Sequence, residues 1–243
     1  MYSQPRELRM KAKSERLTAI RQKSSAASPK GGVRRVTVRM PAAERRAQIL
    51  NKAFEFFSEY GLTAQTRALA DACGVSQRLL YSVFPNKSAL INAVYETEIA
   101  GVFKAVWFVQ LRDRSKPMTQ RLNEFYREYY DTVLTRRWMR LFLYASLAEA
   151  EMAPTYIASI ILHLLETMME EAVHEAGLCM PSGQAELQEI GWILHGAVSH
   201  LAIRRHIYHG ETPLAVEKVI ALQVTSFLAG LKAILPADVK DGA

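Results

Sequence analysis

The stretch that most constrains the fold is residues 66–87, TRALADACGVSQRLLYSVFPNK, because it has the spacing of two short helices joined by a tight turn. Apolar residues such as Leu69 and Leu80 recur at helical spacing on either side of the break. The break falls at Gly74, which can adopt the left-handed conformation that ends a helix, and Ser76 is a good N-cap for the next one. The stretch therefore predicts a helix-turn-helix.

The second of these helices leaves a polar face outward, formed by Gln77, Arg78, Tyr81 and Ser82. Such side chains donate and accept hydrogen bonds, which suits phosphates and base edges. A recognition helix enters the major groove with its N-terminal half against the bases, so Gln77 is expected to read adenine and Arg78 guanine. The alternative for each residue is an ordinary solvated surface position.

A longer set of residues carries a family resemblance. It comprises Thr66, Leu69, Ala70, Gly74, Val75, Ser76, Leu80, Tyr81, Phe84 and Lys87, preceded by the helical segment RRAQILNKAFEFFSEYG. Together they resemble the DNA-binding domain of the TetR family of transcription regulators. The resemblance is close over residues 44–90 and extends elsewhere only to length and helical character. Cys73 departs from the family, which commonly has Ala or another small residue there.

The resemblance implies which residues contact DNA. Arg67 matches a position that can reach a base, whereas Gln65, Thr66, Tyr81 and Lys87 match positions that contact phosphates. Thr66 and Lys87 are also expected near helix N-termini, where backbone N–H groups favour anions. The full set of expected DNA contacts is Gln65, Thr66, Arg67, Ser76, Gln77, Arg78, Tyr81, Ser82 and Lys87.

The composition is that of a soluble globular protein, and 243 residues suffice for one large or two small domains. No stretch approaches the ~20 uninterrupted apolar residues of a membrane span, and the N-terminus lacks the apolar core of a secretory signal. The two cysteines, Cys73 and Cys179, fall in segments assigned to different domains, which predicts reduced thiols. We therefore expect a cytoplasmic protein without membrane contact, in which Cys73 is a buried structural thiol rather than a redox sensor.

Basic charge is concentrated before the helix-turn-helix. Residues 1–41 contain eleven Lys or Arg and two Glu, a net charge of +9, so the remainder carries −2 of the chain's total of +7. The segment mixes this charge with Ser, Pro and Gly and lacks apolar periodicity, so residues 1–40 are predicted to form a disordered tail. The tail either follows the DNA backbone or a minor groove, or is a solvated extension.

Helical periodicity along the rest of the chain predicts an all-α fold of about nine helices. Residues 41–88 are expected to form the three-helix DNA-binding domain, with a first helix from Pro41 to Gly61, and residues 89–243 a ligand-binding and dimerisation domain. A long fourth helix over residues 87–109, capped by Asn86, is expected to join them as a lever, as the family resemblance implies. Later helices are expected near residues 122–133, 141–150, 157–169, 184–209 and 213–235, with breaks at 116–117, 153–154 and 177–183.

A homodimer is expected from the function as well as from the sequence. One recognition helix reads too few base pairs, so two are needed on a palindromic double-stranded operator. The last helix is apolar on two faces, and the helix before it contains small residues that permit close approach, namely Gly191, Gly196, Ala197 and Ala202. We expect a two-fold dimer through helices eight and nine.

The predicted body is rich in aromatic and soft side chains, which suits a pocket for a hydrophobic or aromatic effector. Some of these side chains must simply be core. The candidate ligand contacts are Phe103, Trp107, Tyr126, Tyr130, Tyr144, His163, Met168, Trp192 and His195.

Enzymatic signatures are weak. Glu171 and His174 match half of a di-metal motif whose second half is missing, and His206 and His209 lack a third ligand. No Gly-rich phosphate loop or nucleophile elbow is found, so we expect no catalytic residue, metal or cofactor. The leading hypothesis is a transcriptional repressor released from its operator by a small ligand. The rival is a helical ligand-binding or interaction protein whose helix-turn-helix reads no specific operator.

Overall fold

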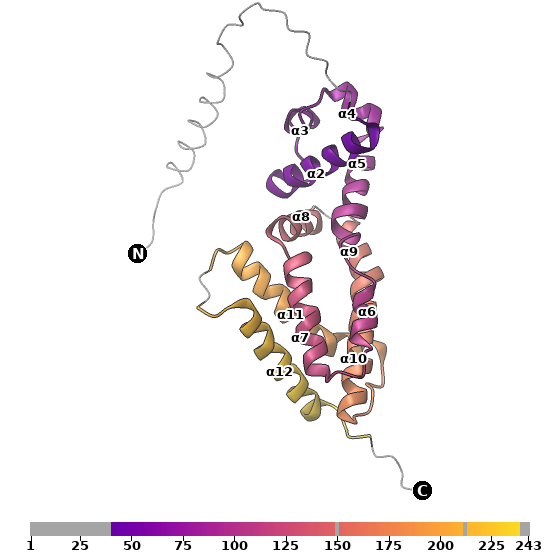
Figure 1. Cartoon of the computed structure of the whole chain (residues 1–243), viewed down its shortest axis with the longest axis vertical. Helices are drawn as coiled ribbons and strands as arrows, with labels where there is room; N and C mark the ends of the chain where they lie inside the picture. The colour runs from indigo at the N-terminus through magenta and orange to yellow at the C-terminus, as the bar shows by residue number, and fades with distance from the viewer. Residues whose placement is uncertain (1–39, 149–150, 211–212, 239–243) are drawn as a thin grey trace, which may run out of the picture. The chain divides into compact units, whose positions relative to one another are not determined.

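The computed structural model of the chain is all-α, as predicted, and describes residues 40–148, 151–210 and 213–238 (Figure 1). Within these residues nine helices have seven or more residues, when each π-helical segment is counted with the helix that it continues. The predicted tail lies outside the described residues except for Met40. The described residues from Pro41 onward belong to one compact unit, so the domain boundary after residue 88 stays a prediction.

The first three helices form the N-terminal part of this unit: α2 (Ala42–Tyr60), α3 (Thr66–Ala72) and α4 (Gln77–Val83). The apolar face predicted for α2 is buried, and Ile49, Ala53 and Phe57 have no exposed surface. α2 ends at Gly61, as predicted, where φ is +78°, a conformation that disfavours a side chain.

The predicted continuous helix over residues 87–109 is wrong. The chain forms α5 (Lys87–Val94), the π-helical segment η1 (Tyr95–Ala100), a turn, and then α6 (Val106–Leu111). A Cβ atom at Gly101 would lie 2.5 Å from the Glu96 carbonyl oxygen, so the tight approach of the backbone there requires glycine. Apolar spacing alone cannot reveal such a break, because buried residues continue on both sides of it.

The remaining helices form the larger part of the unit. They are α7 (Met118–Thr132), α8 (Arg136–Leu147), α9 (Met152–Tyr156), η2 (Ile157–Ile161), α10 (Leu162–Ala176), α11 (Gln184–His206) and α12 (Val216–Ile234). α10 packs against α11, and α12 packs against α7 and α11. α8 begins earlier than predicted because the Thr135 hydroxyl accepts a hydrogen bond from the Trp138 N–H and caps its N-terminus. α11 ends earlier than predicted, and His209 has a φ of +54° outside the helix.

The predicted break at residues 153–154 is also wrong, because α9, η2 and α10 run on as one helix from Met152 to Ala176. Pro154 is tolerated in the first turn, where backbone N–H groups have no partner within the helix. Among the described helices this is the one that is long and apolar enough to cross a membrane, whereas the sequence analysis predicted no membrane span. Half of its most apolar window is buried and it packs against α11, so it has the properties of a core helix.

α8 connects the body to α2. Arg140 Nε donates a 2.6 Å hydrogen bond to the Ser58 carbonyl near the end of α2. The Arg137 guanidinium lies 4.8 Å from the centre of the Phe54 ring and donates a 3.3 Å hydrogen bond to Glu55 Oε1. α8 thus holds α2 by cation–π and charge-assisted contacts in addition to apolar packing.

Candidate nucleic-acid interface and effector cavity

The turn between α3 and α4 has the predicted geometry. Gly74 takes a φ of +68°; its N–H bonds to the Asp71 carbonyl at 3.0 Å, and the Val75 N–H bonds to the Ala70 carbonyl at 3.0 Å. This pair of hydrogen bonds is the Schellman arrangement, which ends a helix on a left-handed glycine. The Ser76 hydroxyl then accepts a 3.1 Å hydrogen bond from the Leu79 N–H and starts α4.

Cys73, the residue before Gly74, connects this turn to α2. The side chain is 2% exposed, and its thiol lies 3.9 Å from the Ile49 carbonyl oxygen, to which it donates. Burial raises the pKa of the thiol to about 11, so it is a thiol and not a thiolate at neutral pH. The expected buried structural cysteine is therefore found.

The predicted DNA-contacting residues are mostly accessible around this turn. Seven are exposed and two, Thr66 and Lys87, are half-buried; the exposed ones are Gln65, Arg67, Ser76, Gln77, Arg78, Tyr81 and Ser82. Some polar groups in this set are already engaged, since Ser76 caps α4 and the Ser82 hydroxyl donates to the Leu79 carbonyl at 2.7 Å. Gln77 and Arg78 lie in the first turn of α4, and both are exposed.

Lys87 has a structural contact that the sequence did not predict. Its ammonium donates a 2.7 Å hydrogen bond to the Ala64 carbonyl, in the loop between α2 and α3, and partial burial lowers its pKa. The contact fastens the start of α5 to the loop that precedes α3. A DNA phosphate at Lys87 could therefore accept only from the ammonium protons that do not bond to Ala64.

Residues 49–94, from within α2 to the end of α5, match the family model described as "Bacterial regulatory proteins, tetR family". The match includes the whole helix-turn-helix. The chain belongs to the TetR family of transcriptional regulators.

The TetR-family fold extends over most of the chain, as three solved structures show. A TetR-like transcriptional regulator from Rhodococcus sp. RHA1 is 22% identical with a TM-score of 0.61, over 79% of this chain and 100% of that one. A TetR-family transcriptional regulator from Streptomyces coelicolor is 18% identical with a TM-score of 0.55, over 80% and 83%. The fatty acid degradation regulator FadR from Bacillus halodurans is 15% identical with a TM-score of 0.57, over 76% and 99%. No curated protein matches the sequence.

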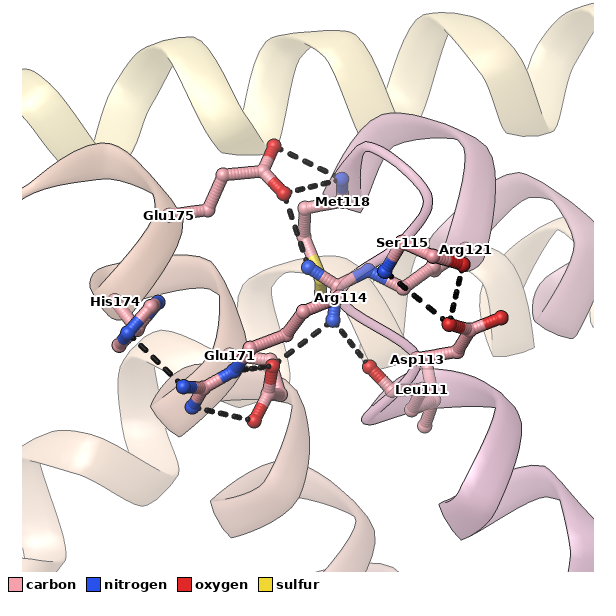
Figure 2. A network of polar contacts seen from close by, with 9 residues as sticks. All are labelled: Leu111, Asp113, Arg114, Ser115, Met118, Arg121, Glu171, His174 and Glu175. Atoms are coloured by element: carbon pink, nitrogen blue, oxygen red, sulfur yellow. Dashed lines mark hydrogen bonds and ion pairs between the residues drawn. The ribbon is translucent and has the colours of Figure 1, made fainter.

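As a TetR-family member the chain is a DNA-binding transcription regulator and not an enzyme, as predicted. The half-motif of Glu171 and His174 has another use in this TetR-family body. Arg114 donates to both oxygens of Glu171, at 2.9 and 3.0 Å, and its Nη1 lies 3.0 Å from His174 Nε2 (Figure 2). Among the described residues no three His, Cys, Asp or Glu side chains are grouped so that they could hold a metal ion.

Figure 2 shows the wider ion-pair network around Glu171, which we call the Arg121 network. Arg121 is 3% exposed; its Nη1 donates to Glu171 at 2.9 Å and to the Leu111 carbonyl, and its Nη2 donates to Glu175 at 2.9 Å. Glu175 also accepts from the backbone N–H of Met118 and so caps α7. The network fastens the end of α6 and the start of α7 to α10.

The TetR-family body contains an apolar cavity of about 260 Å³ between α8, the α9–η2 segment and α11. Its walls are Tyr129, Leu134, Trp138, Met139, Phe142, Leu143, Tyr156, Ile157, Ile161, Trp192, His195, Ser199 and Ile203. Trp138 stacks on Phe142 with ring centres 4.7 Å apart, and Tyr156 meets Trp138 edge-on at 5.3 Å. Its size is close to the lower end of small-molecule sites.

Two of the nine predicted ligand contacts, Trp192 and His195, line this cavity. The other seven do not line it. Phe103 packs on Trp107, which donates to Glu128, and Tyr126 donates to the sulfur of Met168. The remaining three lie beside other residues: Tyr130 beside His206, Tyr144 over Gly61, and His163 beside Phe108. The nine predicted contacts did not include Trp138, Phe142 and Tyr156. The first two are four residues apart on one helix face, which was the available signal.

Some of the small residues expected at a dimer interface are used within the protomer. Ala202 is fully buried, and a Cβ on Gly191 would lie 3.0 Å from the Cβ of Leu165 on α10. In contrast, Ala197 lines an outer groove of about 300 Å³ between α11 and α12. Ile193 and Leu222 line the same groove and are 54% and 53% exposed.

Proposed function

We propose that this TetR-family regulator is a homodimeric repressor that binds a palindromic operator and is released by a small hydrophobic or aromatic effector. The observation that carries the proposal is the position of α8. One face of this helix lines the cavity with Trp138 and Phe142. Its arginines Arg137 and Arg140 contact α2, the first helix of the proposed DNA-binding domain. A ligand that moves α8 therefore acts directly on the DNA-binding helices.

Exposure and placement on α3 and α4 support the proposed DNA contacts. Gln77 and Arg78 lie in the first turn of α4, which is the part of a recognition helix that meets base edges. Arg67 lies in the first turn of α3 and is exposed. The proposed phosphate contacts are Gln65, Thr66, Tyr81 and Lys87, with Lys87 also retaining its bond to Ala64.

The outer groove supports the proposed dimer. Exposed Ile193, Leu222 and Ile234 present apolar surface on α11 and α12, and large exposed apolar patches mark association sites. A two-fold dimer through these helices would bury the same surface on both copies. Because a bacterial regulator acts on chromosomal DNA, we place the protein in the cytoplasm.

η1 supports a second route of coupling. Trp138 Nε1 donates a 3.3 Å hydrogen bond to the Ile99 carbonyl, so a wall of the cavity contacts the segment that continues α5. Occupation of the cavity would move α8 and η1 together, change the spacing of the two recognition helices, and weaken DNA binding by a coupling of about 1–3 kcal/mol. Activation, in which the ligand strengthens DNA binding, would use the same helices.

The test begins with genomic DNA recovered with the purified protein, which is sequenced to find the operator. We expect one inverted repeat to be retained over competitor DNA, and its neighbouring genes to suggest effectors. Retention that is indifferent to sequence would favour the rival, a helical ligand-binding or interaction protein. Release of the operator by an effector would establish the switch. The control is the complex of the Arg78→Ala variant with random DNA, which the effector should not release.

A further inference from the structure

The walls of the cavity are uncharged. Of the described residues that line it, none is Asp, Glu, Lys or Arg, and most are aromatic or aliphatic. An ionised ligand group placed there would lose its hydration without gaining an opposite charge, and this is strongly unfavourable. A neutral ligand does not incur this cost.

The cavity favours a flat ring. One aromatic wall consists of Trp138, Phe142 and Tyr156. The other consists of Trp192 and His195 on α11, whose ring centres lie 5.3 Å from each other. Aromatic rings pack well in offset or edge-to-face contact with such walls.

One deeply buried polar atom at the cavity has no hydrogen-bond partner within the described residues. His195 is 3% exposed, lies among the rings of Tyr126, Tyr129 and Trp192, and its Nδ1 makes no hydrogen bond there. Burial lowers the pKa of His195 to about 4, so the imidazole is neutral at neutral pH. The other deeply buried polar groups of the lining, the hydroxyls of Tyr129 and Tyr156, lie 3.3 Å apart and pair with each other.

We propose that the cavity binds an uncharged aromatic ring compound that bears one hydroxyl, and that His195 selects this class by hydrogen bonding to the hydroxyl. A hydroxyl fits either tautomer, since it can donate to the bare imidazole nitrogen or accept from the protonated one. The identification of this compound as the effector rests on the proposed function, but its binding does not.

The test uses four probes with one ring system: 2-naphthol, naphthalene, 2-naphthoate and 2-(aminomethyl)naphthalene. At neutral pH these are a neutral hydroxyl compound, a neutral compound without a hydroxyl, an anion and a cation. Dissociation constants are measured by equilibrium dialysis against the full-length protein. We expect 2-naphthol to bind most tightly, about tenfold more tightly than naphthalene, as one buried hydrogen bond allows. Tighter binding of the anion or the cation, or binding of none of the four, would overturn the proposal.

Variants at His195 test its role. In His195→Phe, which keeps a ring of similar size, the tenfold preference for 2-naphthol over naphthalene should vanish while naphthalene still binds. His195→Leu provides the same comparison should the first variant fail to fold, and His195→Gln, which retains hydrogen-bonding groups, should keep most of the preference. The matched control is His163→Phe, because His163 is exposed beside Phe108, away from the cavity. A preference that persists in both His195→Phe and His195→Leu would refute selection by His195.

The operator complex separates this inference from the proposed function. Histidine-dependent binding of 2-naphthol that leaves the operator bound would support the inference and count against 2-naphthol release as the switch. A protein that retains its operator but binds none of the probes would contradict the inference and leave the regulator proposal in place.

Discussion

Replacement of Arg121 by Met tests the Arg121 network. Met keeps much of the side-chain volume but removes the guanidinium, which is buried between α6, α7 and α10. Removal of one partner from a buried ion pair costs about 3–5 kcal/mol, because the other charge is left without compensation. The relevant charge here is Glu171, whose side chain is 7% exposed.

Two contacts reduce the expected cost. Arg114 still donates to both oxygens of Glu171, and Glu175, with 41% of its side chain exposed, can be hydrated. The Leu111 carbonyl, however, loses its hydrogen bond to Arg121. We therefore expect Arg121→Met to lower the free energy of unfolding by about 3 kcal/mol, at the lower end of the range for broken buried pairs.

Equilibrium unfolding in urea at fixed protein concentration measures this loss, since the stability of an oligomer depends on concentration. The matched control is Arg114→Met, which removes a half-exposed partner of the same carboxylate and should have a much smaller effect. A loss below about 1 kcal/mol for Arg121→Met, or a larger loss for Arg114→Met, would show that the network is not what holds α6 and α7 to α10.

The same network sets a pH dependence. Hydrogen bonds from Arg114 and then Arg121 lower the pKa of Glu171 below its ordinary value of 4.5, against the effect of burial. The stabilisation is therefore fully present above pH 4.5 and is lost as the pH falls through the lowered pKa. The loss of stability between neutral and acidic pH should be smaller in Arg121→Met than in the wild type.

Three further predictions concern DNA, assembly and coupling. Arg78→Ala should weaken operator binding by about 1–3 kcal/mol and random DNA much less; equal weakening on both in a gel-shift titration would remove its base-reading role. Leu222→Glu should convert a dimer to a monomer in light scattering because it places a charge in the apolar groove, whereas the same change at exposed Val109 on α6 should not. Trp138→Phe should leave operator affinity near that of the wild type and reduce effector-induced release, because Phe keeps the aromatic wall but lacks the bond to Ile99; unchanged release would exclude that bond from the coupling.

The local parts of the fold were predictable because their signals are local. Gly74, Ser76 and Asn86 each determine a turn or a cap within four residues of themselves, and all three act as predicted. The buried face of α2 follows from helical spacing in the same way. The family resemblance, carried by residues within α2 to α5, identified the function from these local signals.

The interruptions of the long helices and the position of the cavity were not predictable in this way. Gly101 reads as an ordinary residue in a helical pattern, and its role depends on carbonyls of the preceding turn. The cavity depends on how far apart α8 and α11 pack, which a single sequence does not specify. Aromatic content therefore indicated a site in the body but did not distinguish Trp138 and Tyr156 from core residues such as Trp107.

The anchoring of Leu111 by Arg121 limits how α6 can move. Because the last residue of α6 is fastened to Glu171 on α10 through Arg121, sliding of α6 along its own axis would break this contact. Rotation of α6 about that end would keep the contact. In the proposed two-fold dimer this constraint would act in both copies.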